Sequence, residues 1–135
     1  MKIDTNIFEN VSNKQKNKKL NDYLKNNVRG KDYYIDDIKI ICNNITIGKL
    51  RYGNTLFSKE INKSIRKDLK ANIIANLEKV VFYSVIIQEG KKDTKNHKFA
   101  NEFDRRKTII SYNGQKYEVM FEVGRKDEIN TLYGD

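Results

Sequence analysis

The pattern of apolar and polar residues is clearest near the end of the chain, where it predicts a β-hairpin. Residues 108–112 and 115–123 are strand-like, and in the second run Tyr, Val and Phe alternate with Lys, Glu and Met. This alternation is typical of a strand with one face on a core and the other in water. Asn113-Gly114 lies between the runs and favours a type I′ turn, whose central residues have positive φ. We therefore expect the two runs to pair antiparallel in a fixed register.

A second pattern predicts one long amphipathic helix in the middle of the chain. Apolar residues recur every four positions, at Ile61, Ile65, Leu69, Ile73, Leu77 and Val81. Such a stripe faces a core, and the lysines and arginine around it would face water. Ser58 is a suitable N-cap for this helix.

Shorter elements are predicted elsewhere in the chain. Residues 4–27 are typical of two short basic helices that stop before Gly30, a residue suited to helix ends. Residues 33–41 and 45–50 are rich in β-branched and aromatic types, which predicts two strands around an Asn43-Asn44 turn. Two further short strands are expected at residues 85–87 and 129–133, with a loop at residues 90–96.

Together these elements predict an α+β fold. N-terminal helices and one long amphipathic helix would pack on an antiparallel sheet of about four strands. At 135 residues the chain fits one domain, with a basic helical segment at 1–30 and an α+β core at 31–135. The single cysteine excludes an intramolecular disulfide, and no apolar run approaches the roughly 20 residues of a membrane span. The start lacks a signal peptide, so the expected location is the cytosol, here of a bacterial host.

The net positive charge of the chain suggests nucleic acid as a candidate partner. The formal net charge is +9 and the pI is about 9.5, which favours nucleic acid because Lys and Arg neutralise phosphates. Lysine, asparagine and isoleucine dominate the composition, a bias typical of AT-rich genomes, and this bias explains part of the basicity. A basic functional face and a merely solvated surface are therefore both open.

Candidate chemistry is concentrated just before the hairpin. His97, the single histidine, is the natural general acid or base because it titrates near neutrality. Nearby lysines (Lys91, Lys92, Lys95 and Lys98) would hold an RNA phosphate, and Arg105, Arg106 and Lys107 would stabilise the charge of a pentavalent phosphorane. A solvated surface histidine and a solvated strand edge are the alternatives. The carboxylates have no metal-ligand spacing, so neither a metal nor another cofactor is expected.

Aromatic residues could add stacking. Tyr112 and Tyr117 flank the turn and Tyr133 lies near the chain end, where each could stack on an unpaired base. The alternative for each is a ring that covers the core.

Several short motifs lie in a distinctive order. They are Lys95-x-His97-x-Phe99, Phe103-Asp104-x-Arg106, Ile109-Ile110, Asn113-Gly114-x-x-Tyr117-x-Val119 and Leu132-Tyr133. This order resembles the large polyvalent protein-associated domains of phages and mobile elements, which are similar to the barnase–EndoU–colicin–RelE (BECR) nuclease superfamily. The resemblance extends upstream to the strand pair 38–50 and the helix 61–81.

This resemblance implies helices on an antiparallel sheet and, in active members, metal-independent ribonuclease chemistry. If the roles in the family are carried over to the matching motif positions, His97 would be the general acid or base. Arg106, with Arg105, would supply the positive charge that stabilises the transition state. Thr108, Lys116 and Tyr133 would be assisting groups. The chain departs from the family in having no evident Glu–His pair of the barnase kind.

Two functions follow as hypotheses, and a structural or packaging accessory of a phage is a third, less specific option. The first is a small basic RNA-acting protein of phage or mobile-element origin, a metal-independent endoribonuclease toxin with a cognate immunity protein. The second is a non-catalytic phage inhibitor, similar to an anti-CRISPR protein, that binds a host ribonucleoprotein defence complex. Both predict RNA or a ribonucleoprotein as partner and no membrane.

Overall fold

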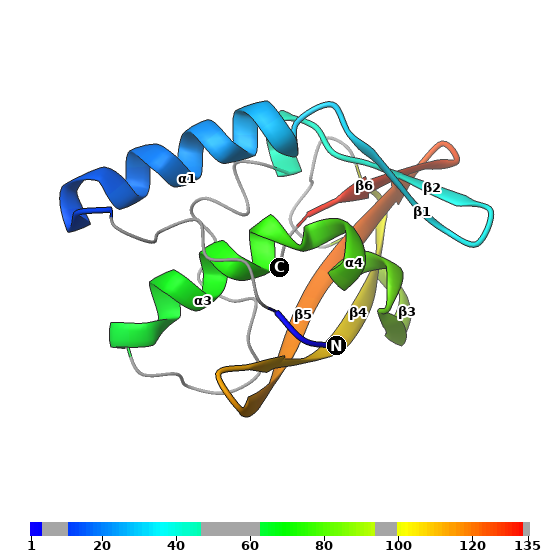
Figure 1. Ribbon diagram of the computed structural model, residues 1–135. Helices are drawn as coiled ribbons and strands as arrows, with labels where there is room; N and C mark the ends of the chain where they lie inside the picture. The colour runs from blue at the N-terminus through cyan, green and yellow to red at the C-terminus, as the bar shows by residue number, and fades with distance from the viewer. Residues whose placement is uncertain (4–10, 47–62, 94–99, 134–135) are drawn as a thin grey trace.

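The protein is built around a curled, six-stranded mixed sheet that forms a half-barrel (Figure 1). The computed structural model describes residues 1–3, 11–46, 63–93 and 100–133. In these residues the strand order across the sheet is β1-β2-β6-β5-β4-β3. The strands are β1 (Asp32–Ile35), β2 (Ile38–Ile41), β3 (Val85–Lys92), β4 (Glu102–Tyr112), β5 (Gln115–Lys126) and β6 (Ile129–Leu132). The expectation of about four antiparallel strands is therefore wrong.

The hairpin at Asn113-Gly114 is confirmed. Both turn residues have positive φ, 51° and 79°, and Tyr112 pairs with Gln115 across the two-residue turn. The pairing continues to Glu102 opposite Arg125, so the hairpin is longer than its apolar alternation indicated. These two strands are the longest of the sheet.

One parallel pair makes the sheet mixed. The β1–β2 hairpin joins the rest of the sheet through β2, where Ile40 lies opposite Asn130 of β6 in parallel pairing. The strand predicted at 129–133 is confirmed as β6. Asp127 and Glu128 form its turn from β5, and both have positive φ.

The predicted strand pair at 33–41 and 45–50 is wrong in detail. Asp36, with φ 53°, starts the turn that folds residues 33–41 into the β1–β2 hairpin. Asn43 instead begins a helix, because its Oδ1 accepts hydrogen bonds from the backbone N–H groups of Ile45 (2.9 Å) and Thr46 (3.2 Å). The Asn43 N–H donates to Thr46 Oγ1 at 3.1 Å, which completes a reciprocal cap. Residues 47–50 lie outside the described residues.

Besides the helical turn that follows Asn43, the described part of the chain contains the helices α1 (Asn13–Asn27), α3 (Lys63–Ala75) and α4 (Leu77–Phe82). The predicted long helix is therefore two helices, separated at Asn76, whose ψ of 23° is not helical. Its side-chain Nδ2 donates to Asn72 O at 2.8 Å, a local bond of the kind that lowers helix propensity. The start of the predicted helix, residues 58–62, lies outside the described residues, as does most of the first predicted helix.

The core lies between the helices and one face of the sheet (Figure 1). The apolar stripe is buried as predicted at Leu69, Ile73, Leu77 and Val81. They pack with residues of α1 and of the sheet, among them Leu24, Ile110, Val119, Phe121 and Leu132. A smaller cluster on the opposite face contains Ala100, Phe103 and Tyr133. In the part of the chain that the structure describes, no helix is long and apolar enough to cross a membrane.

Candidate functional site

The histidine-centred part of the predicted site falls outside the described residues. His97, Lys95 and Lys98 all lie in residues 94–99. Their predicted roles stay predictions.

Arg105 and Arg106 are adjacent on β4 but lie on opposite faces of the sheet. Arg106 is 8% exposed, and it donates from Nε to Ser84 Oγ at 2.7 Å and from Nη2 to Ser84 O at 3.1 Å. Burial lowers the pKa of Arg106, and the charges of Asp104 and Asp36 act in the opposite direction. Arg105 forms an ion pair with Glu122 at 3.2 Å. The two guanidinium groups therefore do not converge on one phosphate.

The predicted assisting groups are also dispersed. Thr108 is buried, and its Oγ1 donates to Val80 O at 2.6 Å. Tyr133 is buried on the other face, where its ring meets Phe103 edge to face at 5.0 Å. Lys116 is exposed beside the hairpin turn. The structure does not bring these three side chains together.

The predicted RNA-binding residues differ in their surroundings. Lys91 and Lys92 are exposed at the end of β3. Tyr112 and Tyr117 are partly buried against the core, which fits rings that cover the core more than rings that stack on bases. Tyr112 also accepts a hydrogen bond from Asn72 Nδ2 at 3.0 Å. Lys107 lines a surface groove, and its Nζ is 3.9 Å from Glu118 Oε1.

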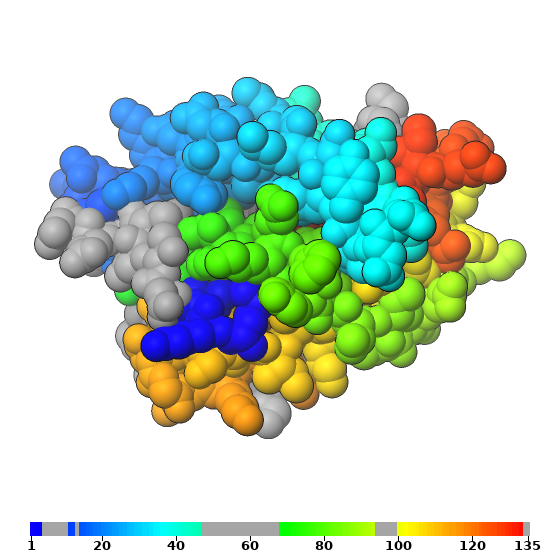
Figure 2. All heavy atoms as spheres, turned by 45° about the vertical axis from the view of Figure 1, so that its right-hand side comes forward, coloured from blue at the N-terminus to red at the C-terminus, as the bar shows by residue number. Residues whose placement is uncertain are grey.

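That groove has a volume of about 1330 Å³. It is bounded by Met1 and Lys2, by α4, by the start of β3 and by residues 107–109 of β4. Figure 2 shows the dark-blue N-terminal residues, the green helices and the yellow strand β4 meeting on one face. Hydrogen bonds hold the N-terminal residues in place on β4: Ile3 N donates to Ser111 O (3.0 Å), and the Met1 ammonium donates to Ile109 O (3.1 Å).

Three exposed aromatic side chains line the groove. Tyr34 is 55% exposed, Phe82 is 55% exposed and Tyr83 is 61% exposed. Phe82 and Tyr83 end α4 with their rings edge to face at 5.1 Å. Tyr34 faces outward on β1 because its neighbour Tyr33 points into the core, as strand alternation requires. We name Tyr34, Phe82 and Tyr83 the aromatic triad.

The charges of the groove are predominantly basic. Lys2, Lys79 and Lys107 line it, with Glu78 as the acidic member. We name these three lysines the groove lysines. A basic hollow with exposed rings offers both phosphate neutralisation and base stacking.

Sequence reasoning missed the aromatic triad and Lys79, although a signal was present. Phe82 and Tyr83 follow Val81, the last residue of the apolar stripe, so they lie where the repeat of core-facing positions ends. Large apolar rings off the buried face indicate a binding surface more than a core.

A metal site and a family relationship are two further questions for this chain. Within 1–3, 11–46, 63–93 and 100–133, no three His, Cys, Asp or Glu side chains gather as they would around a metal ion. Comparison with protein-family models, with curated proteins and with solved structures finds no match to this chain. The likeness to the BECR superfamily therefore stays a prediction.

Proposed function

We propose that this protein binds single-stranded RNA in the groove lined by the aromatic triad and the groove lysines. The observation that carries the proposal is the exposure of Tyr34, Phe82 and Tyr83 inside one basic groove. Exposing three large rings at one place is unfavourable in water unless a partner covers them.

Stacking and charge would act together in this groove. A base stacked on an aromatic side chain contributes about 1–3 kcal/mol, and this contribution tolerates any base sequence. The groove lysines would neutralise the phosphates between the stacked bases, and the net charge of +9 would attract RNA over longer distances. Duplex RNA hides its bases in the stack, so unpaired RNA is the expected ligand.

Binding is better supported than cleavage. In-line attack by a 2′-hydroxyl needs an acid, a base and a cation arranged around one phosphate. Arg105 and Arg106 face opposite ways, and Thr108 and Tyr133 are enclosed in two different packed layers. An endoribonuclease activity would depend on His97, and it is tested by incubating total RNA in EDTA with the wild type and with His97→Ala.

A labelled oligouridine tests the binding proposal by fluorescence anisotropy. We expect Phe82→Ala and Tyr83→Ala each to weaken binding by about tenfold, because each removes a stacking surface. Ile129→Ala is the matched control, since Ile129 is a comparably exposed apolar side chain on β6 that does not line the groove. Equal affinity for all four proteins would contradict the proposal, as would preference for a duplex.

A charge-matched pair separates the groove from general basicity. Lys79→Gln removes a charge inside the groove, and Lys116→Gln removes one at the exposed hairpin turn. A larger loss of RNA affinity in Lys79→Gln than in Lys116→Gln would support binding in the groove. Equal losses would show that RNA is held by the net charge alone.

A second form of the same function is inhibition of a ribonucleoprotein complex, as in an anti-CRISPR protein acting in a bacterial cytosol. Its supporting observation is the exposed aliphatic run Val85-Ile86-Ile87 on β3, at the edge of the sheet beside the groove. A protein component of such a complex would cover this run while its RNA occupied the groove. Binding to the intact complex that is much tighter than binding to its RNA would favour this form.

A further inference from the structure

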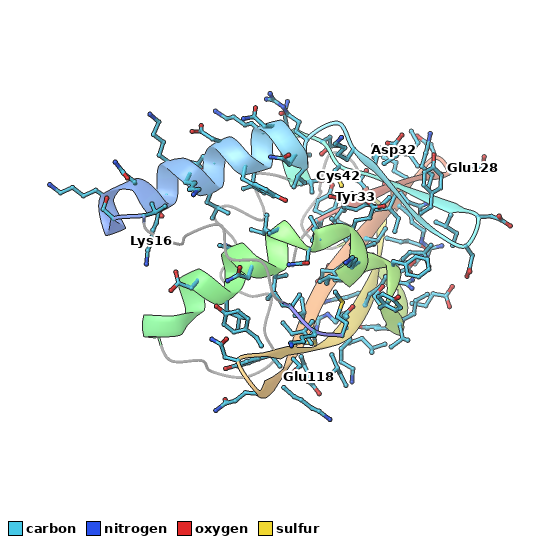
Figure 3. The ribbon with its side chains drawn as sticks, viewed as in Figure 1. Lys16, Asp32, Tyr33, Cys42, Glu118 and Glu128 are labelled. Atoms are coloured by element: carbon cyan, nitrogen blue, oxygen red, sulfur yellow. The ribbon has the colours of Figure 1, made fainter. Side chains whose placement is uncertain are left out.

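We propose a second binding site, separate from the groove, for a small aliphatic amino acid. The site is a cavity of about 330 Å³ between the β1–β2 hairpin and strands β3, β4 and β5. Glu128 lies at its edge, at the end of the sheet where the β1–β2 hairpin meets the turn between β5 and β6 (Figure 3). The RNA proposal does not depend on this site.

The Arg106 guanidinium supplies a buried positive charge to the cavity. Two of its five N–H donors are used by Ser84, and among the described residues Arg106 has no ion pair within 4 Å. An arginine cannot escape burial by losing its proton, so a buried guanidinium favours an anionic partner. A carboxylate would satisfy the remaining donors in a planar, two-bond arrangement.

Asp104, a carboxylate whose charge acts on Arg106, already accepts other hydrogen bonds. Asp104 Oδ1 accepts hydrogen bonds from Arg125 Nη2 at 3.0 Å and from Gly90 N at 2.9 Å. Arg125 also pairs with Glu102 at 3.2 Å, yet its Nε is buried without a hydrogen-bond partner in the described part of the chain. Arg125 lines the same cavity, so its side chain adds a second positive charge to the lining.

Aliphatic side chains make up part of the lining of the cavity. They are Ile35, Ile38 and Ile40 of the β1–β2 hairpin, Ile86 of β3 and Val123 of β5. Ile38 and Ile86 are also partly open to solvent, at 49% and 44% exposure. Small-molecule sites combine apolar walls with placed polar groups, and this cavity has both, with five aliphatic residues and six polar or charged ones in its lining. Branched aliphatic walls suit a leucine-like or isoleucine-like side chain.

Two exposed carboxylates select the charge type of the ligand. Glu89 and Glu128 line the cavity and are exposed at its mouth. They repel phosphates and other multiply charged anions, and they would attract an ammonium group. A carboxylate for Arg106, an ammonium for the mouth and an aliphatic body between them describe an α-amino acid.

Calorimetric titration with L-leucine tests the site on the full chain. We expect L-leucine to bind, and 4-methylpentanoate, isoamylamine and glycine to bind about tenfold more weakly, because each lacks one of the three recognised groups. Absence of L-leucine binding up to its solubility limit would overturn the proposal. Equal affinity for L-leucine and 4-methylpentanoate would overturn the assignment of the mouth.

Variants connect binding to the named residues. Arg106→Gln should abolish binding, but Arg106 is buried and this variant must first be shown to fold by circular dichroism. Glu89→Gln and Glu128→Gln alter exposed side chains, and each should weaken L-leucine while leaving 4-methylpentanoate unchanged or stronger. Glu78→Gln is the control, an equal change of charge in the RNA groove. Loss of L-leucine affinity in the control alone, or in no variant, would refute the site.

Discussion

Arg106 joins β4 to the connection between α4 and β3, because both its hydrogen bonds go to Ser84, at 2.7 Å to Oγ and 3.1 Å to the carbonyl oxygen. Ser84 Oγ also donates to Val81 O at 2.6 Å, so one hydroxyl links the arginine to the last turn of the helix. A positive charge at a helix C-terminus is favourable. This link also lies between the two proposed sites, since Val85 lines the RNA groove and Ile86 lines the cavity.

The first prediction concerns that link. Ser84→Ala removes the acceptor of the Arg106 Nε–H group and leaves this buried donor unsatisfied, which should lower the free energy of unfolding by about 2 kcal/mol. Urea denaturation measures the loss. A loss below about 0.5 kcal/mol would mean that water or a rearranged Arg106 replaces the bond.

The second prediction compares two buried threonines. Thr46 Oγ1 donates to Leu132 O at 2.6 Å, whereas Thr131 Oγ1 is buried without a hydrogen-bond partner in the described residues. Thr131→Val should therefore be neutral or stabilise the fold by about 1 kcal/mol, and Thr46→Val should destabilise it by about as much. Both variants replace a hydroxyl with a methyl group. Equal changes in the free energy of unfolding, measured by urea denaturation, would therefore contradict the difference in hydrogen bonding between Thr46 and Thr131.

The third prediction concerns the close contact of β5 with the smaller cluster. A Cβ atom at Gly124 would lie 2.6 Å from Ala100 Cβ and 2.7 Å from Tyr133 Cε2. Gly124→Ala should lower the free energy of unfolding by about 2–3 kcal/mol, because Ala100 and the Tyr133 ring must both shift to make room for the new methyl group. Pairing it with Tyr133→Leu, which frees space, should recover part of the loss. Additive effects of the two changes would show that Tyr133 is not the obstacle.

Local chemistry explains which elements could be predicted from the sequence. Asn113-Gly114 determines a turn by itself, because both positions need positive φ, and β6 follows from a short run of strand formers. The turn predicted at Asn43 is wrong because an Asn side chain can either form a turn or cap a helix. Here it caps a helix together with Thr46, whose hydroxyl is in turn bonded to β6. The parallel pairing of Ile40 with Asn130 depends on residues far apart in the chain, and no local pattern records it.

The site was harder to predict than the fold for a related reason. The sequence places Arg105 and Arg106 side by side, which predicts one paired positive site. Neighbouring residues on a strand point to opposite faces, however, so Arg105 binds Glu122 and Arg106 binds Ser84. Tyr34, by contrast, is defined as exposed only once Tyr33 is known to be buried. Which surface residues share a groove depends on tertiary packing.

The last prediction concerns alkaline pH. Burial, with a smaller contribution from Asp32, raises the pKa of the Cys42 thiol from its ordinary value to about 12, and burial also raises the pKa of its neighbour Tyr33 (Figure 3). In the unfolded chain the thiol ionises near pH 9, so above that pH the unfolded state holds fewer protons than the folded state, and stability falls as pH rises. At pH 10 the loss from Cys42 should be about 1.4 kcal/mol relative to pH 7.

Cys42→Ala isolates this contribution, because the variant keeps Tyr33 and loses the thiol. The wild type should be the more stable protein at pH 7, since the substitution opens space in the core, and its advantage should shrink by about 1.4 kcal/mol at pH 10. Urea denaturation of both proteins at the two pH values gives the difference. An unchanged advantage would mean that the thiol titrates alike in both states, which would require Cys42 to be accessible to water in the folded protein.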